Sequence, residues 1–121
     1  MAKMKRLVKL EGVRNVVMDE VDVPTPSPSE VLVKVKRSLI SRGSELFRRY
    51  VMEEALPPDM MGYSDAGEIV EVGADLASIE PGQRSSLGGP HAEYAAGEPF
   101  IIPGKMDYET ATFIPLSTSA L

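Results

Sequence analysis

The sequence predicts a mainly β domain, an all-β barrel or sandwich with short helices, and three observations support this fold class. Short runs of alternating apolar and polar residues recur along the chain, and ten glycines and ten prolines separate them. The sequence has no internal repeat and no long amphipathic helix. Its 121 residues suit a single hydrophobic core, so we expect residues 1–121 to form one domain.

The expected strands follow one another between turn signals. Residues 5–10 and 13–23 predict two strands joined by a turn at Glu11-Gly12, and the proline-rich segment 24–29 predicts a loop. Residues 30–38 alternate most regularly, with valines at every second position on one face. The remaining predicted elements are strands over 66–73, 91–97 and 100–103 and a type II turn at Pro81-Gly82.

Two short helices complete the predicted elements. Residues 44–54 predict a helix with Ser44 as its N-cap, and residues 107–113 predict one capped by Asp107, with Pro115 breaking or restarting it. At the start of the chain, basic residues alternate with apolar ones. We expect these basic side chains to form the solvent-facing side of a strand: Lys3, Lys5, Arg6 and Lys9.

The composition excludes several classes of function. A net charge of −5 argues against nucleic acid or an anionic membrane surface as the main partner. The absence of cysteine excludes disulfides and thiolate metal sites, and a single histidine, His91, excludes a multi-histidine centre within this chain. No apolar run approaches the roughly 18 residues of a membrane span, and no signal-type segment follows the N-terminus. A cytoplasmic location fits these features.

Three stretches carry polar side chains suited to chemistry. In the first, Ser41, Arg42, Ser44 and Glu45 surround Gly43 at a strand-to-helix junction, where they either bind an anionic group and move a proton or only cap the helix. In the second, Tyr63 and Ser64 precede a strand bracketed by glycines and either face a cleft or belong to the core. The third contains His91, the natural acid/base candidate unless its role is structural.

These stretches, in this order, resemble one family. The segments are "VPTPSPSEVLVKVKRSLIS", "RGSE", "MGYSDAGEIVEVG", "IEPGQR", "HAEY" and "IIPGKMDYETATFIPLSTSAL". Together they resemble the N-terminal, GroES-like catalytic domain of the medium-chain dehydrogenase/reductase superfamily, which includes zinc alcohol dehydrogenases and quinone oxidoreductases. The resemblance covers the chain from about residue 4 to its end and implies a partly open β-barrel with short helices.

The sequence departs from this family at the metal ligands. Zinc-dependent members carry Cys-Gly-Ser/Thr-Asp, whereas this chain has Arg42 at the cysteine position and Glu45 at the aspartate position. In the following Gly-His-Glu motif, Tyr63 replaces the histidine and Ser64 the glutamate. The cysteine-rich lobe of the structural zinc is also absent, so we expect no zinc, as in a zinc-poor subgroup that includes bacteriochlorophyllide-type dehydrogenases.

The resemblance implies an NAD(P)-dependent oxidoreductase acting on a small-molecule alcohol, carbonyl or enone. Ser44, Tyr63 and His91 are then the catalytic candidates, and Ser41, Arg42, Glu45 and Ser64 the substrate-binding ones. The chain has no dinucleotide-binding fingerprint, so we expect NAD or NADP to be held by a Rossmann domain that follows the chain in its parent protein. By itself the chain is expected to be inactive and to form a homo-oligomer through the surface left uncovered. The alternative is a non-catalytic GroES-like binding or assembly module.

Overall fold

The structure is a computed structural model that describes residues 2–40, 45, 48–57, 61, 62 and 64–115. Seven strands and one short helix follow one another along this part of the chain. They are β1 (Lys3–Lys9), β2 (Val16–Asp22), β3 (Val31–Ser38), β4 (Asp65–Val72), β5 (Arg84–Leu87), β6 (Tyr94–Gly97), β7 (Phe100–Ile101) and α1 (Tyr108–Ala111). The predicted mainly β class is therefore confirmed.

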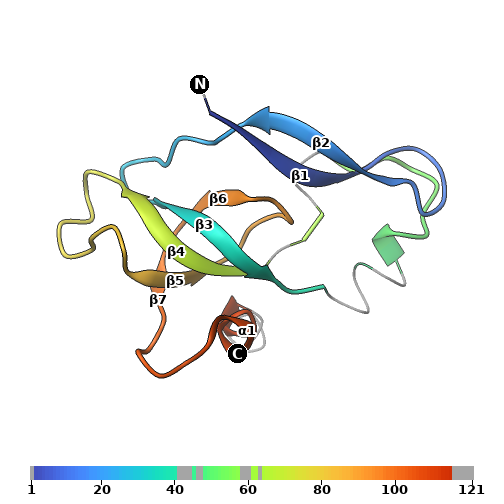
Figure 1. Ribbon diagram of the computed structural model, residues 1–121. Coiled ribbons are helices and arrows are strands. Elements are labelled where there is room, and N and C mark those ends of the chain that lie inside the picture. The colour runs from blue at the N-terminus through green and yellow to red at the C-terminus, as the bar shows by residue number, and fades with distance from the viewer. Residues whose placement is uncertain (1, 41–44, 46–47, 58–60, 63, 116–121) are drawn as a thin grey trace.

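The strands form two sheets that together make a partly open barrel (Figure 1). One sheet is the antiparallel β1–β2 hairpin, and the other has five strands in the order β6-β3-β4-β5-β7. Backbone hydrogen bonds join the two sheets, because Leu7 donates to the carbonyl of His91 (2.9 Å) and Glu93 donates to that of Lys5 (3.0 Å). In Figure 1 the hairpin lies on one side of the larger sheet and α1 on the other.

The core lies on the faces that the alternation predicts. Val31 and Val33 are fully buried and pack with Ile69, Leu87 and Ala95. Leu32, on the opposite face of β3, is also buried, which accounts for the one apolar residue among the lysines of that face. A second, smaller cluster of Ala66, Ile102 and Ala111 packs α1 against β4.

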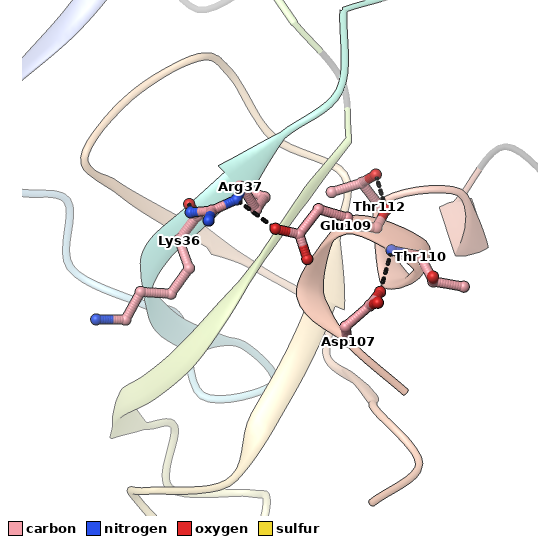
Figure 2. Close-up of polar contacts among 6 residues, drawn as sticks. All are labelled: Lys36, Arg37, Asp107, Glu109, Thr110 and Thr112. Carbon is pink, nitrogen blue, oxygen red and sulfur yellow. Dashed lines mark hydrogen bonds and ion pairs between the residues drawn. The ribbon is translucent and has the colours of Figure 1, made fainter. Parts of the chain in front are cut away.

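The cap of α1 is the one predicted from the sequence (Figure 2). The Asp107 carboxylate accepts a hydrogen bond from the Thr110 backbone N–H at 2.7 Å, and the Thr110 side chain first and this backbone bond second lower the pKa of Asp107. Arg37, near the end of β3, forms an exposed ion pair with Glu109 at 2.8 Å. Residues 114 and 115 are helical again, so Pro115 belongs to a restarted turn.

The helix predicted over 44–54 is confirmed only in its first part, because Glu45, Arg48 and Arg49 are in a π-helical conformation and the helix does not continue beyond residue 50. The Tyr50 N–H donates to the carbonyl of Glu45, five positions earlier, which closes a wide turn, and residues 51–54 are not helical. The carbonyls of Tyr50 and Glu53 instead accept hydrogen bonds from Arg14 and Gly12. The turn between β1 and β2 thus takes up the backbone groups that would extend a helix.

The prediction that Lys9 faces solvent is also wrong. Lys9 is 1% exposed, and its ammonium donates to three carbonyl oxygens: Leu10 (2.7 Å), Gly12 (2.7 Å) and Glu54 (3.1 Å). Because carbonyls from the hairpin turn and from the segment after residue 50 converge at the end of β1, they replace the water that a lysine normally keeps. Lys3 and Lys5 are exposed as predicted, and Arg6 is partly buried.

Candidate functional site

A buried histidine lies at the junction of the two sheets. The Nε2 atom of His91 is 2.5 Å from Oε1 of Glu45, and its Nδ1 atom forms a hydrogen bond with the hydroxyl of Ser38. His91 is 9% exposed and Glu45 is 1% exposed, so this pair is almost completely removed from water. Three residues that are 46 and 53 positions apart in the sequence therefore form one continuous hydrogen-bonded chain.

The backbone around His91 fixes its position from two sides. The His91 N–H donates to the carbonyl of Met61 at 2.7 Å, and its carbonyl accepts from Leu7 at 2.9 Å. Gly62 has a φ of +95°, and a Cβ atom at this position would lie 2.7 Å from the His91 nitrogen and 2.9 Å from ring carbons. Only glycine fits here, both because of its backbone angle and because the imidazole fills the space.

The hydrogen-bond partners assign the imidazole tautomer. A carboxylate only accepts, so the Nε2 atom of His91 carries the hydrogen that it donates to Glu45. The Nδ1 atom is then free to accept the hydroxyl hydrogen of Ser38. With this tautomer, Nδ1 is a base that is hydrogen-bonded to a hydroxyl.

A second buried carboxylate lies beside this chain. Asp65, the first residue of β4, is the direct cross-strand partner of Ser38, is fully buried, and has no hydrogen bond of normal geometry from the described residues. Burial raises the pKa of Asp65 from 3.8 to about 7, with the nearby Ser38 hydroxyl lowering it and the charge of Glu45 raising it. Near neutral pH, Asp65 therefore exchanges between its neutral and charged forms.

Ser38 and His91 reach the surface through a groove between the hairpin and the larger sheet. The groove has a volume of about 350 Å³. Its walls include the apolar side chains of Leu7, Met18 and Val35 and the basic residues Lys5 and Arg6. A larger cavity of about 440 Å³ lies on the other side of Arg6, between Met4, Val21 and Tyr94. The histidine is buried but borders a space that can admit a small molecule.

Three of the seven predicted site residues lie in the described part of the chain. The structure brings Glu45 and His91 together, a pairing that the sequence did not indicate. Ser64 is fully buried, and its hydroxyl donates to the carbonyl of Thr112, so it ties β4 to the end of α1 rather than facing the groove. Ser41, Arg42, Ser44 and Tyr63 lie outside the described residues.

Sequence reasoning missed Ser38 and Asp65. Both residues lie at strand ends, where polar side chains are common, and no motif marks either one. Their only signal is that Asp65 begins a run of otherwise core-forming residues, since "DAGEIV" places a carboxylate directly before a buried alanine and glycine. The pairing of β3 with β4 places the two residues opposite each other.

The donor set does not suit a zinc ion. Zinc prefers cysteine, histidine and carboxylate ligands, and the chain has arginine, tyrosine and serine where zinc-binding relatives of the family carry them. Of these three residues, Ser64 is the one described, and its hydroxyl is already bonded to a carbonyl. Within the described residues, no group of three or more His, Asp or Glu side chains is placed to hold a metal ion.

The overall architecture defines the class of protein: a GroES-like barrel of the kind found in dehydrogenases. The chain can be superposed on a structure of an alcohol dehydrogenase superfamily protein from Novosphingobium aromaticivorans with a TM-score of 0.76, at 25% identity, over 93% of this chain and 38% of that one. An alcohol dehydrogenase of Escherichia coli in complex with NADH matches with a TM-score of 0.77, at 23% identity, over 99% of this chain and 44% of that one.

Sequence comparison agrees with the fold. The chain is 35% identical over 107 residues to an L-threonine 3-dehydrogenase of Pyrococcus abyssi. This match covers 85% of the chain but 28% of that enzyme, so the chain spans less than a third of the relative's length. No family model matches the sequence. The chain belongs to the medium-chain dehydrogenase/reductase superfamily, and its fold matches the GroES-like domain of that superfamily.

No described helix is long and apolar enough to cross a membrane.

Proposed function

We propose that this chain is the substrate-binding domain of an NAD(P)-dependent oxidoreductase that works without zinc. The observation that carries this proposal is the match to L-threonine 3-dehydrogenase over 85% of the chain, combined with arginine, tyrosine and serine at the expected zinc-ligand positions. The substrate is a small alcohol, carbonyl compound or enone. Nicotinamide, when bound, supplies or accepts the hydride, and the residues of this chain hold the substrate oxygen and move its proton.

Hydrogen bonds and a fixed charge replace the metal in this proposal. A metal in a dehydrogenase stabilises the oxyanion that develops on the substrate, and preorganised donors can do the same in a water-poor site. Ser44, Tyr63 and Arg42 are the proposed donors, with Ser41 beside them. His91 moves the proton, and Glu45 orients its imidazole through the 2.5 Å contact. Ser64 acts indirectly, by fixing the end of α1 on β4.

We further propose that a nucleotide-binding domain follows this chain in the natural protein and holds NAD or NADP. The first experiment is calorimetry of the 121-residue chain with NAD and NADP, for which we expect no binding heat. The second is expression of the natural protein that contains this chain, with zinc measured by plasma mass spectrometry. We expect nicotinamide binding, less than 0.1 zinc per chain as an order-of-magnitude bound, and turnover that is unchanged by EDTA.

Two results would overturn these proposals. One zinc per chain, lost together with activity in EDTA, would reject the metal-free mechanism and leave the oxidoreductase assignment intact. A natural protein without any nicotinamide binding would reject the oxidoreductase assignment and favour a binding or assembly module. A cytoplasmic location and self-association of the isolated chain remain predictions.

A further inference from the structure

We propose that Ser38, His91 and Glu45 have a further catalytic activity, in which Ser38 is the nucleophile for acyl transfer from small esters. This inference shares His91 and Glu45 with the oxidoreductase proposal, but it can be tested separately because it requires no nicotinamide, no metal and no further domain. Each of its three residues belongs to the described part of the chain. The site consists of a hydroxyl, a base and an orienting carboxylate joined by hydrogen bonds.

The order of the three groups is the one that nucleophilic catalysis requires. The Ser38 hydroxyl is hydrogen-bonded to Nδ1 of His91, and the opposite ring nitrogen contacts the Glu45 carboxylate at 2.5 Å. Glu45 therefore fixes the tautomer in which Nδ1 has a free lone pair, and it stabilises the imidazolium that forms when Ser38 loses its proton. Asp65, opposite Ser38 in the sheet, adds negative charge near this serine when it is ionised.

The groove gives a substrate access to this hydroxyl. Ser38 is half-buried and borders the groove of about 350 Å³ together with His91. Leu7, Met18 and Val35 provide an apolar wall for an acyl chain. The groove's volume is near the lower end of the range for ligand sites, so the substrate class is a small carboxylic ester with a short apolar acyl group.

Arg6 supplies a donor for the charge that develops on the carbonyl oxygen. It borders the same groove, and its Nε atom is buried without a hydrogen-bond partner among the described residues. One terminal nitrogen of Arg6 holds Asp19 at 3.2 Å, which restrains the guanidinium. The positive charge of Arg6, at the wall of the groove, would stabilise an oxyanion that develops there.

The reaction has two balanced steps. Ser38 Oγ bonds to the acyl carbon, its proton passes to His91 Nδ1, and the bond to the leaving alcohol breaks as that proton is returned to the alcohol oxygen. Water then attacks the acyl-serine, with His91 again accepting and returning the proton, and the carboxylic acid leaves. Ser38 is regenerated without an oxidant or a second substrate.

The experiment uses the folded 121-residue chain and two probes, a fluorophosphonate and p-nitrophenyl acetate. Peptide mass spectrometry should find a single adduct on Ser38, and the same chain in urea should lose this selectivity. Glu45→Gln and His91→Gln should slow labelling by roughly 100-fold, the usual contribution of a general base. The matched control is Ser29→Ala, which removes an exposed serine in the loop before β3 and should leave the rate unchanged.

Several outcomes would overturn the proposal. An adduct on any serine other than Ser38, or no adduct at all, would reject Ser38 as the nucleophile. Equal labelling of Ser38 in folded and urea-unfolded chains would show that the site does not activate it. This comparison uses only the unmodified chain, so it decides the question even where a variant at His91 or Glu45 fails to fold.

Discussion

Replacing Asp65 with asparagine should remove a large pH dependence from the stability of this domain. Asp65 is fully buried, and its pKa is raised from 3.8 to about 7, so the folded chain holds this proton more tightly than the unfolded chain does. The free energy of unfolding therefore falls as the pH rises from about 4 to about 7, and this contribution stays constant above pH 7. The difference of about 3 pH units corresponds to about 4 kcal/mol at pH 8.

The assay is urea unfolding at several pH values between 4 and 8, followed by far-ultraviolet circular dichroism, because the chain has no tryptophan. Asparagine has nearly the same shape as aspartate but cannot ionise. Asp65→Asn should match the original chain at low pH and exceed its stability by a few kcal/mol at pH 8. The matched control is Asp75→Asn, which changes an exposed carboxyl outside the strands.

Other groups also titrate in this range, so the informative quantity is the difference between the two chains at each pH. If Asp65→Asn and the original chain lose stability in parallel from pH 5 to pH 8, then Asp65 does not carry a raised pKa. If Asp75→Asn flattens the curve as much as Asp65→Asn does, the effect is one of net charge and not of burial.

The remaining predictions concern the fold and its surface. Lys9→Met should lower the free energy of unfolding by on the order of 3 kcal/mol, because three carbonyls would lose a charged donor. Urea titrations measure this loss, and a loss below about 0.5 kcal/mol would contradict the buried position of the Lys9 ammonium. Gly67→Ala should lower the free energy of unfolding by about 1–3 kcal/mol, because the new Cβ would lie 2.0 Å from the carbonyl oxygen of Lys34. The control is Gly104→Ala, which has nothing within 4 Å and should leave the free energy of unfolding almost unchanged. Equal losses for the two variants would reject the steric explanation. The isolated chain should self-associate in sedimentation velocity experiments. Phe100→Glu should weaken this association, because the side chain of Phe100 is 52% exposed beside an apolar groove. An original chain that stays monomeric at high concentration would reject the predicted self-association.

The strands were predictable where one face meets the core. In β3 the alternation alone identifies Val31 and Val33 as core residues, because a period of two places them on the same side of the sheet. β5 was not predicted, because "RSSL" has no alternating pattern. Ser85 and Ser86 are nevertheless fully buried there, since β5 lies between β4 and β7.

Side-chain environments that depend on distant segments were not predictable. Lys9 has the same local pattern as Lys5, yet it is buried because a carbonyl 45 positions later lies next to it. The site shows the same limit. His91 and Glu45 were each recognised as candidates, but their contact depends on the joining of the two sheets. Ser38 and Asp65 become visible only when β3 and β4 are paired in register.

The long sequence separations in the Ser38–His91–Glu45 chain also have a consequence for synthesis. After a ribosome has added Glu45, it must still add 46 residues before the histidine that donates a hydrogen bond to this carboxylate exists. Until then, Glu45 lacks this hydrogen bond, and burial of its carboxylate is less favourable without it. We therefore expect the wide turn at Glu45 to close late, after β6 has joined β3, and the nascent chain to be sensitive to proteases near residue 45 until that point.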